Sequence, residues 1–201
     1  MVRERTYRSE AIVLKRTDFG EADRLLTLYT RDFGKVRAIA KGARKPQSRK
    51  TGHVELFMRS SCFFAKGRDL DILTQAEMVE AYLALREDLV RTTYAAYAVE
   101  LLDRFTVEED AHLDIYNLLA SALDWLAHHE DVMLVARYFE LHLLSLSGFR
   151  PQLFNCVASG EPIEEQDQFF SAELGGFLSP AMHSADRRAK PVSAIAVQVL
   201  R

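Results

Sequence analysis

The side chains in this sequence that are best suited to binding a ligand are a dense set of Lys and Arg residues within its first quarter. Residues 31–50 hold eight basic side chains and one acidic side chain. Cations at this density attract polyanions, because a phosphate chain gains from each ammonium or guanidinium group that it contacts. We therefore predict phosphate contacts from six side chains: Arg37, Lys41, Arg44, Lys45, Arg49 and Lys50. The alternative for the same residues is a plain solvated loop.

The charge balance of the two parts of the chain supports the first interpretation. Residues 1–80 hold 17 basic and 11 acidic residues, a net charge of +6, whereas residues 81–201 hold 9 and 18, a net charge of −9. A basic part on an otherwise acidic chain is typical of a nucleic-acid-binding surface. Nearby aromatic residues can stack on bases, and two of them, next to Gly in predicted turns, are expected at the surface: Phe19 and Phe33.

Catalytic motifs are missing from the sequence. Neither the GxxxxGK[ST] nor the GxGxxG phosphate loop occurs, and there is no GxSxG elbow and no HExxH helix. The carboxylates of residues 1–80 are scattered, whereas a metal-dependent nuclease needs several that converge. We therefore expect no use of ATP and no cofactor, with a metal-dependent nuclease as an alternative function.

The two cysteines, Cys62 and Cys156, are too few for a disulfide framework. Cys62 falls in an apolar run and is expected in the core. The stretches 156–160 and 175–182 have the spacing of two zinc-ribbon knuckles, but the other three ligand positions hold Ser159, Ser179 and Met182. These side chains do not complete a tetrahedral thiolate cage, so we expect no metal site. A zinc-stabilised module is the alternative.

The elements that carry the basic side chains are predicted to be strands. Residues 35–40 alternate between apolar and mostly basic positions, which indicates a strand with one basic face. The following segment, 41–52, is too rich in charge, Gly and Pro to pack as a regular element. Further strands are predicted at 10–14, 24–30, 53–65 and 70–78. Five short strands in about 80 residues favour a five-stranded barrel of the OB-fold type.

After about residue 80 the apolar pattern takes a helical period, with breaks near 106–111, 127–131 and 148. The period fades between 151 and 190, where Gly and Pro are frequent, and a new helix begins at Ser193 and is still running at Arg201. We therefore expect an α+β protein with an OB-fold domain at 1–80 and an α-helical domain at 81–201. Residues 151–190 form a degenerate zinc-ribbon-like insertion, and the sequence is expected to be a fragment of a longer chain.

The composition is that of a globular protein, with 48% hydrophobic and 27% charged residues. The longest run without Asp, Glu, Lys or Arg is 174–185, far shorter than the roughly 20 residues that span a bilayer. The first residues contain no apolar core of a secretion signal. We therefore expect a cytoplasmic protein that does not bind membranes.

Several short stretches together resemble the RecO family of bacterial DNA repair and recombination mediators. They occur in order over nearly the whole chain: 11–14, 20–28, 33–35, 40–44 and 76–77, then 100–102, 139–141, 143–144, 148–149 and 151. The stretch 156–160 resembles the branch of the family whose zinc ribbon has decayed. The C-terminal helices of the family would follow Arg201.

The resemblance implies a DNA-binding mediator that is not an enzyme. It implies binding of single- and double-stranded DNA, annealing of complementary strands, and help in loading RecA onto strands coated by single-strand-binding protein (SSB). The implied partners are RecR and the acidic C-terminal tail of SSB, in a nucleoid-associated cytoplasmic location. Arg137 is the candidate for the SSB tail, against the alternative of an ordinary surface cation. An interaction adaptor that never contacts DNA is the rival function.

Overall fold

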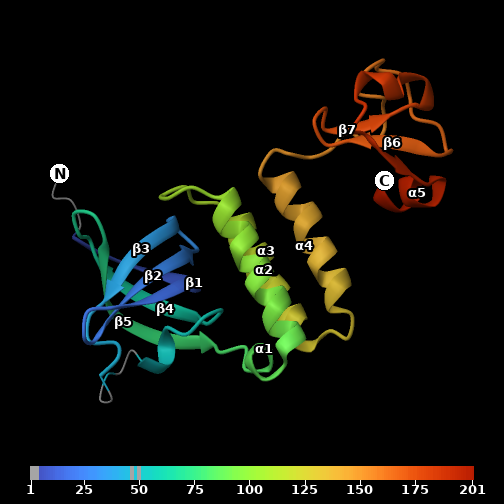
Figure 1. Cartoon of the computed structure of the whole chain (residues 1–201). Coiled ribbons are helices and arrows are strands. Elements are labelled where there is room, and N and C mark those ends of the chain that lie inside the picture. The colour runs from blue at the N-terminus through green and yellow to red at the C-terminus, as the bar shows by residue number, and fades with distance from the viewer. Residues whose placement is uncertain (1–4, 46–47, 49–50) are drawn as a thin grey trace. The chain divides into compact units, whose positions relative to one another are not determined.

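The computed structural model describes residues 5–45, 48 and 51–201 of the chain. The chain forms two compact units, Met1–Leu143 and Leu144–Arg201. The first unit contains a β-barrel followed by helices, and the second contains a small sheet and a short helix (Figure 1). The predicted α+β class, with an N-terminal five-stranded barrel and helices after it, is confirmed.

The barrel consists of β1 (Thr6–Phe19), β2 (Asp23–Thr30), β3 (Gly34–Ala40), β4 (Arg59–Ala65) and β5 (Asp71–Glu80). It closes in the order β1-β2-β3-β5-β4, and every pair is antiparallel except β3 with β5. The long strand β1 pairs with both β2 and β4, and the register shift between Val13 and Lys15 marks a bulge where it bends. This bend lets one strand belong to both sides of the barrel.

The alternation of side chains along each strand explains the barrel core. In β3, Val36, Ala38 and Ala40 are buried, whereas Arg37 on the opposite face is exposed. Cys62 and Phe64 of β4 also point into this core, so the predicted core position of Cys62 is confirmed. Burial raises the pKa of the Cys62 thiol to about 12.

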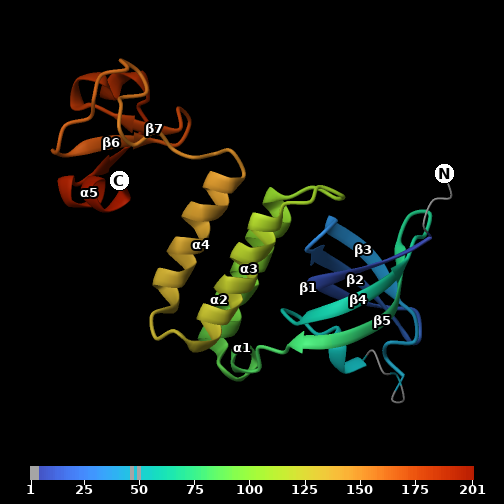
Figure 2. The same cartoon turned by 180° about the vertical axis from the view of Figure 1, so that it is seen from behind.

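The outer face of β1 carries a second core, which the helices cover. These helices are α1 (Ala84–Glu87), α2 (Leu89–Phe105), α3 (Leu113–His128) and α4 (Val132–Leu146), and the breaks between α2, α3 and α4 fall where the sequence predicts them. Ile12 and Leu14 of β1 and Tyr29 of β2 are buried in one cluster with side chains of α2 and α3. Figure 2 shows α2 and α3 beside the barrel. The barrel side formed by β1 and the end of β2 is therefore covered.

The strand predicted at 53–65 is confirmed at 59–65, which form β4, but it is wrong for the residues before them. Residue 53 ends the short 3-10 helix η1 (Thr51–His53), and residues 54–58 connect this helix to β4 without forming a strand. Val54 is buried in the barrel core, and Phe57, with a φ of 69°, is buried in the helix-covered core. The apolar residues of this segment are buried in two different cores. Their apolar pattern in the sequence therefore resembles that of a strand.

Lys35 attaches the barrel to α2 instead of facing solvent. Its Nζ donates to Asp103 Oδ1 at 3.1 Å and to the carbonyl oxygens of Asp103 and Thr106 at 2.6 and 2.7 Å, and its side chain is only 12% exposed. Lys15 Nζ donates to the other carboxylate oxygen of Asp103 at 2.6 Å. The C-terminal end of a helix favours cations, which suits this site at the end of α2. Partial burial opposes ionisation of Asp103, but the two lysines outweigh it and lower the pKa of this carboxyl group.

Replacing Asp103 with Asn is expected to lower the free energy of unfolding by about 2 to 3 kcal/mol at neutral pH, because it leaves a largely buried ammonium group without its anion. Since the folded-state pKa of Asp103 is depressed, this contribution is present above the unfolded pKa of about 3.9 and is lost as the pH falls through the folded-state pKa. Urea unfolding from pH 7 downward measures it. The difference from the native chain should shrink at low pH, and a difference that stays constant would contradict the assignment. Asp69→Asn, which removes an exposed carboxylate, is the control.

The second unit is built on a three-stranded antiparallel sheet in the order β7-β6-β8, formed by β6 (Gln168–Ser171), β7 (Gly176–Leu178) and β8 (Lys190–Val192). The 3-10 helix η2 (Pro180–Ala185) lies between β7 and β8, and α5 (Ala194–Leu200) follows them. Ser193 caps α5 by accepting from the Ala196 N–H at 3.3 Å, which confirms the predicted helix start. Within the described part of the chain, no helix is both long enough and apolar enough to cross a membrane.

Candidate nucleic-acid interface

The outer face of β3 presents cations to solvent. The Arg37 side chain is exposed, and its Nε lies 3.9 Å from Glu108 Oε1. An exposed ion pair at this distance contributes little, so the guanidinium can exchange this partner for a phosphate. Lys41 follows on the same side, is exposed, and makes no hydrogen bond or ion pair with any residue that the structure describes. β3 and the turn after it thus carry two exposed cations, Arg37 and Lys41.

The turn after β3 is fastened to the loop between β1 and β2. Gly42 has a φ of 66°, and its N–H donates to Asp23 Oδ1 at 2.7 Å. The Arg44 N–H donates to the Ala22 carbonyl at 2.9 Å, and Arg44 Nη1 donates to the Gly20 carbonyl at 3.3 Å. Phe19, at the edge of the same loop, is 52% exposed. Arg44 and an exposed aromatic ring therefore lie at one end of the barrel.

Arginines outnumber carboxylates in the ion-pair network at this end. Arg44 Nε lies 3.3 Å from Asp18, and Arg24 shares Asp18 at 3.4 Å. Arg24 also contacts Glu55 at 2.8 Å, and Arg16 contacts the other oxygen of Glu55 at 2.8 Å. Three guanidinium groups thus share two carboxylates in this network, and Arg44 is one of them.

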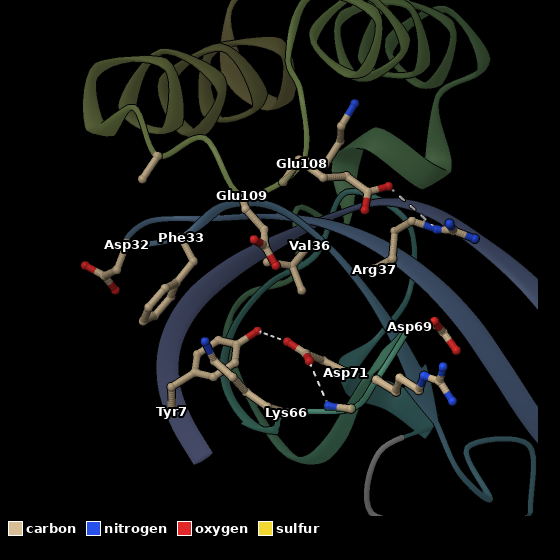
Figure 3. A pocket seen from close by; sticks show the side chains of 14 residues that line it. Tyr7, Asp32, Phe33, Val36, Arg37, Lys66, Asp69, Asp71, Glu108 and Glu109 are labelled. Atoms are coloured by element: carbon tan, nitrogen blue, oxygen red, sulfur yellow. Dashed lines mark hydrogen bonds and ion pairs between the residues drawn. The ribbon is translucent and has the colours of Figure 1, made fainter. Parts of the chain in front are cut away.

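A hollow of about 330 Å³ lies beside Arg37 (Figure 3). It is bounded by β3, by the loop 66–70 that joins β4 to β5, and by the segment 106–112 that joins α2 to α3. The loop supplies two further cations, Lys66 and Arg68. The rings of Tyr7 and Phe33 also line the hollow, with centroids 4.4 Å apart and planes tilted by 55°.

The sequence did not single out Lys66, Arg68 or Tyr7. They lie about 30 positions from Arg37 in either direction, and only the closure of the barrel brings them to it. The sequence feature that could have identified Lys66 and Arg68 is the basic turn between the last two predicted strands. In an OB-type barrel this turn and the loop between β1 and β2 flank the ligand face.

Three of the six predicted cations are located on β3 and in the turn after it: Arg37, Lys41 and Arg44. Lys45 is exposed but is not free of partners. Arg49 and Lys50 lie outside the described residues. Phe19 and Phe33 are partly exposed, as predicted, at 52% and 36%. The assignment of the six cations to phosphates stays a prediction.

Arg137 lies on α4 and is 58% exposed. It contacts Glu140 Oε2 at 2.8 Å, and the other oxygen of Glu140 accepts from the Tyr97 hydroxyl at 2.6 Å. Exposed apolar side chains at helical spacing, Met133 and Leu141 among them, share this part of α4. The structure thus places a cation beside apolar side chains, and its partner stays a prediction.

The four knuckle positions come together in the second unit. Cys156 Sγ accepts from the Ser179 N–H at 3.5 Å, and Met182 packs against the apolar cluster that contains Cys156. Desolvation opposes ionisation of Cys156, but hydrogen bonds from Ser159 and from nearby backbone N–H groups outweigh it and lower the pKa of the thiol to about 6. In the described part of the chain, no three His, Cys, Asp or Glu side chains are placed to hold a metal ion. The zinc-ribbon-like character of the insertion stays a prediction.

A closed five-stranded barrel with a cationic strand, followed by a helical region, defines a protein of the OB-fold class. Comparison with known families places it further. The family model described as "Recombination protein O N terminal" matches residues 2–82, and "Recombination protein O C terminal" matches residues 86–201. The chain therefore belongs to the RecO family, and the resemblance found in the sequence is confirmed.

Individual relatives support the same assignment. A protein of Roseiflexus sp. (strain RS-1) named "DNA repair protein RecO" is 42% identical over 200 residues, which cover 100% of this chain and 70% of the relative. Proteins of the same name from Dehalococcoides mccartyi and Desulforudis audaxviator are 35% and 42% identical. They are covered over 79% and 77% of their lengths, by 100% and 96% of this chain.

Proposed function

We propose that this chain is a non-enzymatic recombination mediator in DNA repair. It binds single- and double-stranded DNA, anneals complementary strands, and assists the loading of RecA onto SSB-coated strands. Its proposed location is the cytoplasm, in association with the nucleoid. Membership of the RecO family supports the repair role. The single observation that supports DNA binding is the exposure of Arg37, Lys41 and Arg44 on β3 and the turn after it.

The geometry favours contact with phosphates over recognition of a base sequence. Cations exposed on a strand and its following turn contact the sugar–phosphate chain of any sequence. Annealing follows from the same feature, because two strands held on one cationic surface repel each other less. A mediator must act at any site of damage, so this lack of sequence selection suits the role.

Strand annealing by the whole chain tests this proposal. Two complementary oligonucleotides, one labelled with a donor and the other with an acceptor fluorophore, are mixed with and without the protein. We expect the protein to accelerate pairing, and the acceleration to fade as salt is raised, because salt weakens phosphate contacts. No acceleration, together with no salt-sensitive shift of either strand in a gel, would favour the interaction adaptor.

The proposed partners are RecR and the C-terminal tail of SSB. A tail that is both acidic and apolar needs a cation beside an apolar surface, and Arg137 with its neighbours on α4 supplies both. Glu140 holds the guanidinium of Arg137 in place and leaves part of it exposed. This supports the assignment of the tail to α4.

Replacing Arg137 with Ala is expected to weaken binding of an SSB-tail peptide about five- to tenfold, the loss of one charge-assisted hydrogen bond. Fluorescence anisotropy of the labelled peptide measures it. Arg104→Ala is the matched control, because Arg104 is also an exposed helical arginine paired with a glutamate, Glu100. Equal affinities of the native chain and the Arg137 variant would remove the assignment.

A further inference from the structure

The hollow beside Arg37 has an aromatic wall that phosphate binding does not require. Phe33 lies in the turn between β2 and β3, and Tyr7 behind it stacks on Phe64 with centroids 4.9 Å apart. The Tyr7 hydroxyl donates to Asp71 Oδ2 at 2.5 Å. Burial and this hydrogen bond raise the pKa of Tyr7, so the hydroxyl stays protonated. Phe33 is thus a partly exposed ring backed by a fixed one (Figure 3).

The carboxylates that line the hollow differ in whether they can still accept a hydrogen bond from a ligand. Asp71 accepts from Tyr7 and from the Gly67 N–H at 3.1 Å, and Glu108 is paired with Arg37. By contrast, the side-chain carboxylates of Glu109 and Asp69 have no hydrogen bond or ion pair with any described residue. Glu109 points into the hollow near Tyr7 and Val36 (Figure 3). A free carboxylate repels a phosphate but accepts from the N–H groups of a base.

The backbone holds Glu109 in this place. Its φ is 61°, a conformation that residues other than glycine seldom adopt. Its N–H donates to the Lys35 carbonyl at 3.0 Å, which ties the segment to β3. The next residue, Asp110, packs so closely on Gly34 that a Cβ at Gly34 would lie 2.0 Å from the Asp110 carbonyl oxygen. An unusual backbone conformation held by several contacts is typical of a functional site.

Four basic residues line the hollow: Lys35, Arg37, Lys66 and Arg68. Lys35 is held by Asp103 and Thr106, so Arg37, Lys66 and Arg68 are the cations that can face a ligand. A volume of about 330 Å³ falls at the lower end of the range of small-ligand pockets, which suits one nucleobase better than a longer ligand. The lining groups match the three parts of a nucleotide. The ring of Phe33 matches the face of the base, the carboxylate of Glu109 matches its edge, and the cations match the phosphate.

We infer that this hollow takes one unpaired base of the strand whose phosphates contact Arg37, and that it prefers guanine. Guanine carries two adjacent N–H donors on its pairing edge, which one carboxylate can accept together, whereas thymine offers one. The inference rests on the proposed DNA binding and adds to it a site for a base. Stacking on Phe33 gives affinity for any base, and Glu109 gives the preference.

Single-base strands test the inference with the full chain. The probe is a labelled strand of about 16 nucleotides, the upper site size of one such barrel, in which every position is abasic except the central one. That position holds guanine, thymine or no base. We expect the guanine strand to bind about tenfold more tightly than the fully abasic strand, with thymine between them, because stacking of one base contributes about 1 to 3 kcal/mol.

Three variants separate the parts of the site. Phe33→Ala should abolish the gain from either base, and Glu109→Gln should abolish only the preference for guanine over thymine. Phe154→Ala is the control, because Phe154 is an exposed ring of the second unit that does not line the hollow, and this variant should keep both effects. Circular dichroism and urea unfolding confirm that each variant is folded.

Two outcomes would overturn the inference and are distinguishable. If the three strands bind equally with a strong dependence on salt, or if Phe33→Ala keeps the gain, the base site is wrong while DNA binding through phosphates stands. If no strand binds in a salt-dependent way, the proposed function itself fails, and the base site fails with it.

Discussion

Replacing Arg37, Lys41 and Arg44 together with Ala is expected to weaken binding to a short single strand about a hundredfold at 0.1 M salt. Each phosphate contact on single-stranded DNA contributes a slope of about −0.7 to the logarithm of the association constant against the logarithm of salt concentration. Loss of three contacts therefore flattens the slope by about two units. Fluorescence anisotropy titrations at several salt concentrations give both numbers.

A charge-matched control separates this site from the net charge of the chain. Arg104, Arg150 and Arg188 are exposed arginines outside the barrel, and their triple replacement removes the same three charges. We expect this control to change the slope by much less than one unit. If both triple variants flatten the slope equally, the cations of β3 have no special role and the interface assignment is wrong.

Replacing Gly34 with Ala is expected to lower the free energy of unfolding by about 2 to 5 kcal/mol, the combined cost of an unfavourable φ and of overpacking. Gly34 has a φ of 66°, and a Cβ there would lie 2.0 Å from the Asp110 carbonyl oxygen and 2.4 Å from its carbon. Both atoms are backbone, so they cannot move aside as a side chain does. Urea unfolding at neutral pH measures the loss.

Gly20→Ala is the matched control for this effect. Gly20 has a φ of 56°, but no atom lies within 4 Å of a Cβ built there. Gly20→Ala should lower the free energy of unfolding only by the cost of the unfavourable φ, about 1 to 2 kcal/mol. Equal losses at the two glycines would show that the segment 106–112 does not press on the start of β3. The wall of the hollow that carries Glu108 and Glu109 would then be placed wrongly.

Local patterns in the sequence were enough for most of the fold. The alternation in 35–40 predicts which side chains of β3 face the core, and the change of apolar period near residue 80 marks where strands give way to helices. Residues 53–58 fail this method, because Val54 and Phe57 are buried on two different sides of an irregular segment. An apolar pattern in the sequence predicts which residues are buried, but it does not predict the backbone conformation of an irregular segment.

The candidate site was only partly predictable, because its partners are distant in sequence. The density of cations identifies Arg37 and Arg44, but no local pattern shows that Asp18 lies 3.3 Å from Arg44. Lys35 is basic like Arg37 and lies on the same face of β3, yet α2 binds its ammonium group. Which cations stay available to a ligand depends on contacts between the barrel and the helices.

The most direct test of the central claim is the salt dependence of single-strand binding by the unaltered chain. With three to six phosphate contacts, the logarithm of the association constant should fall against the logarithm of salt concentration with a slope of about −2 to −4. Binding that is absent, or that does not change with salt, would contradict the claim that the cations of β3 and its following turn hold a sugar–phosphate chain.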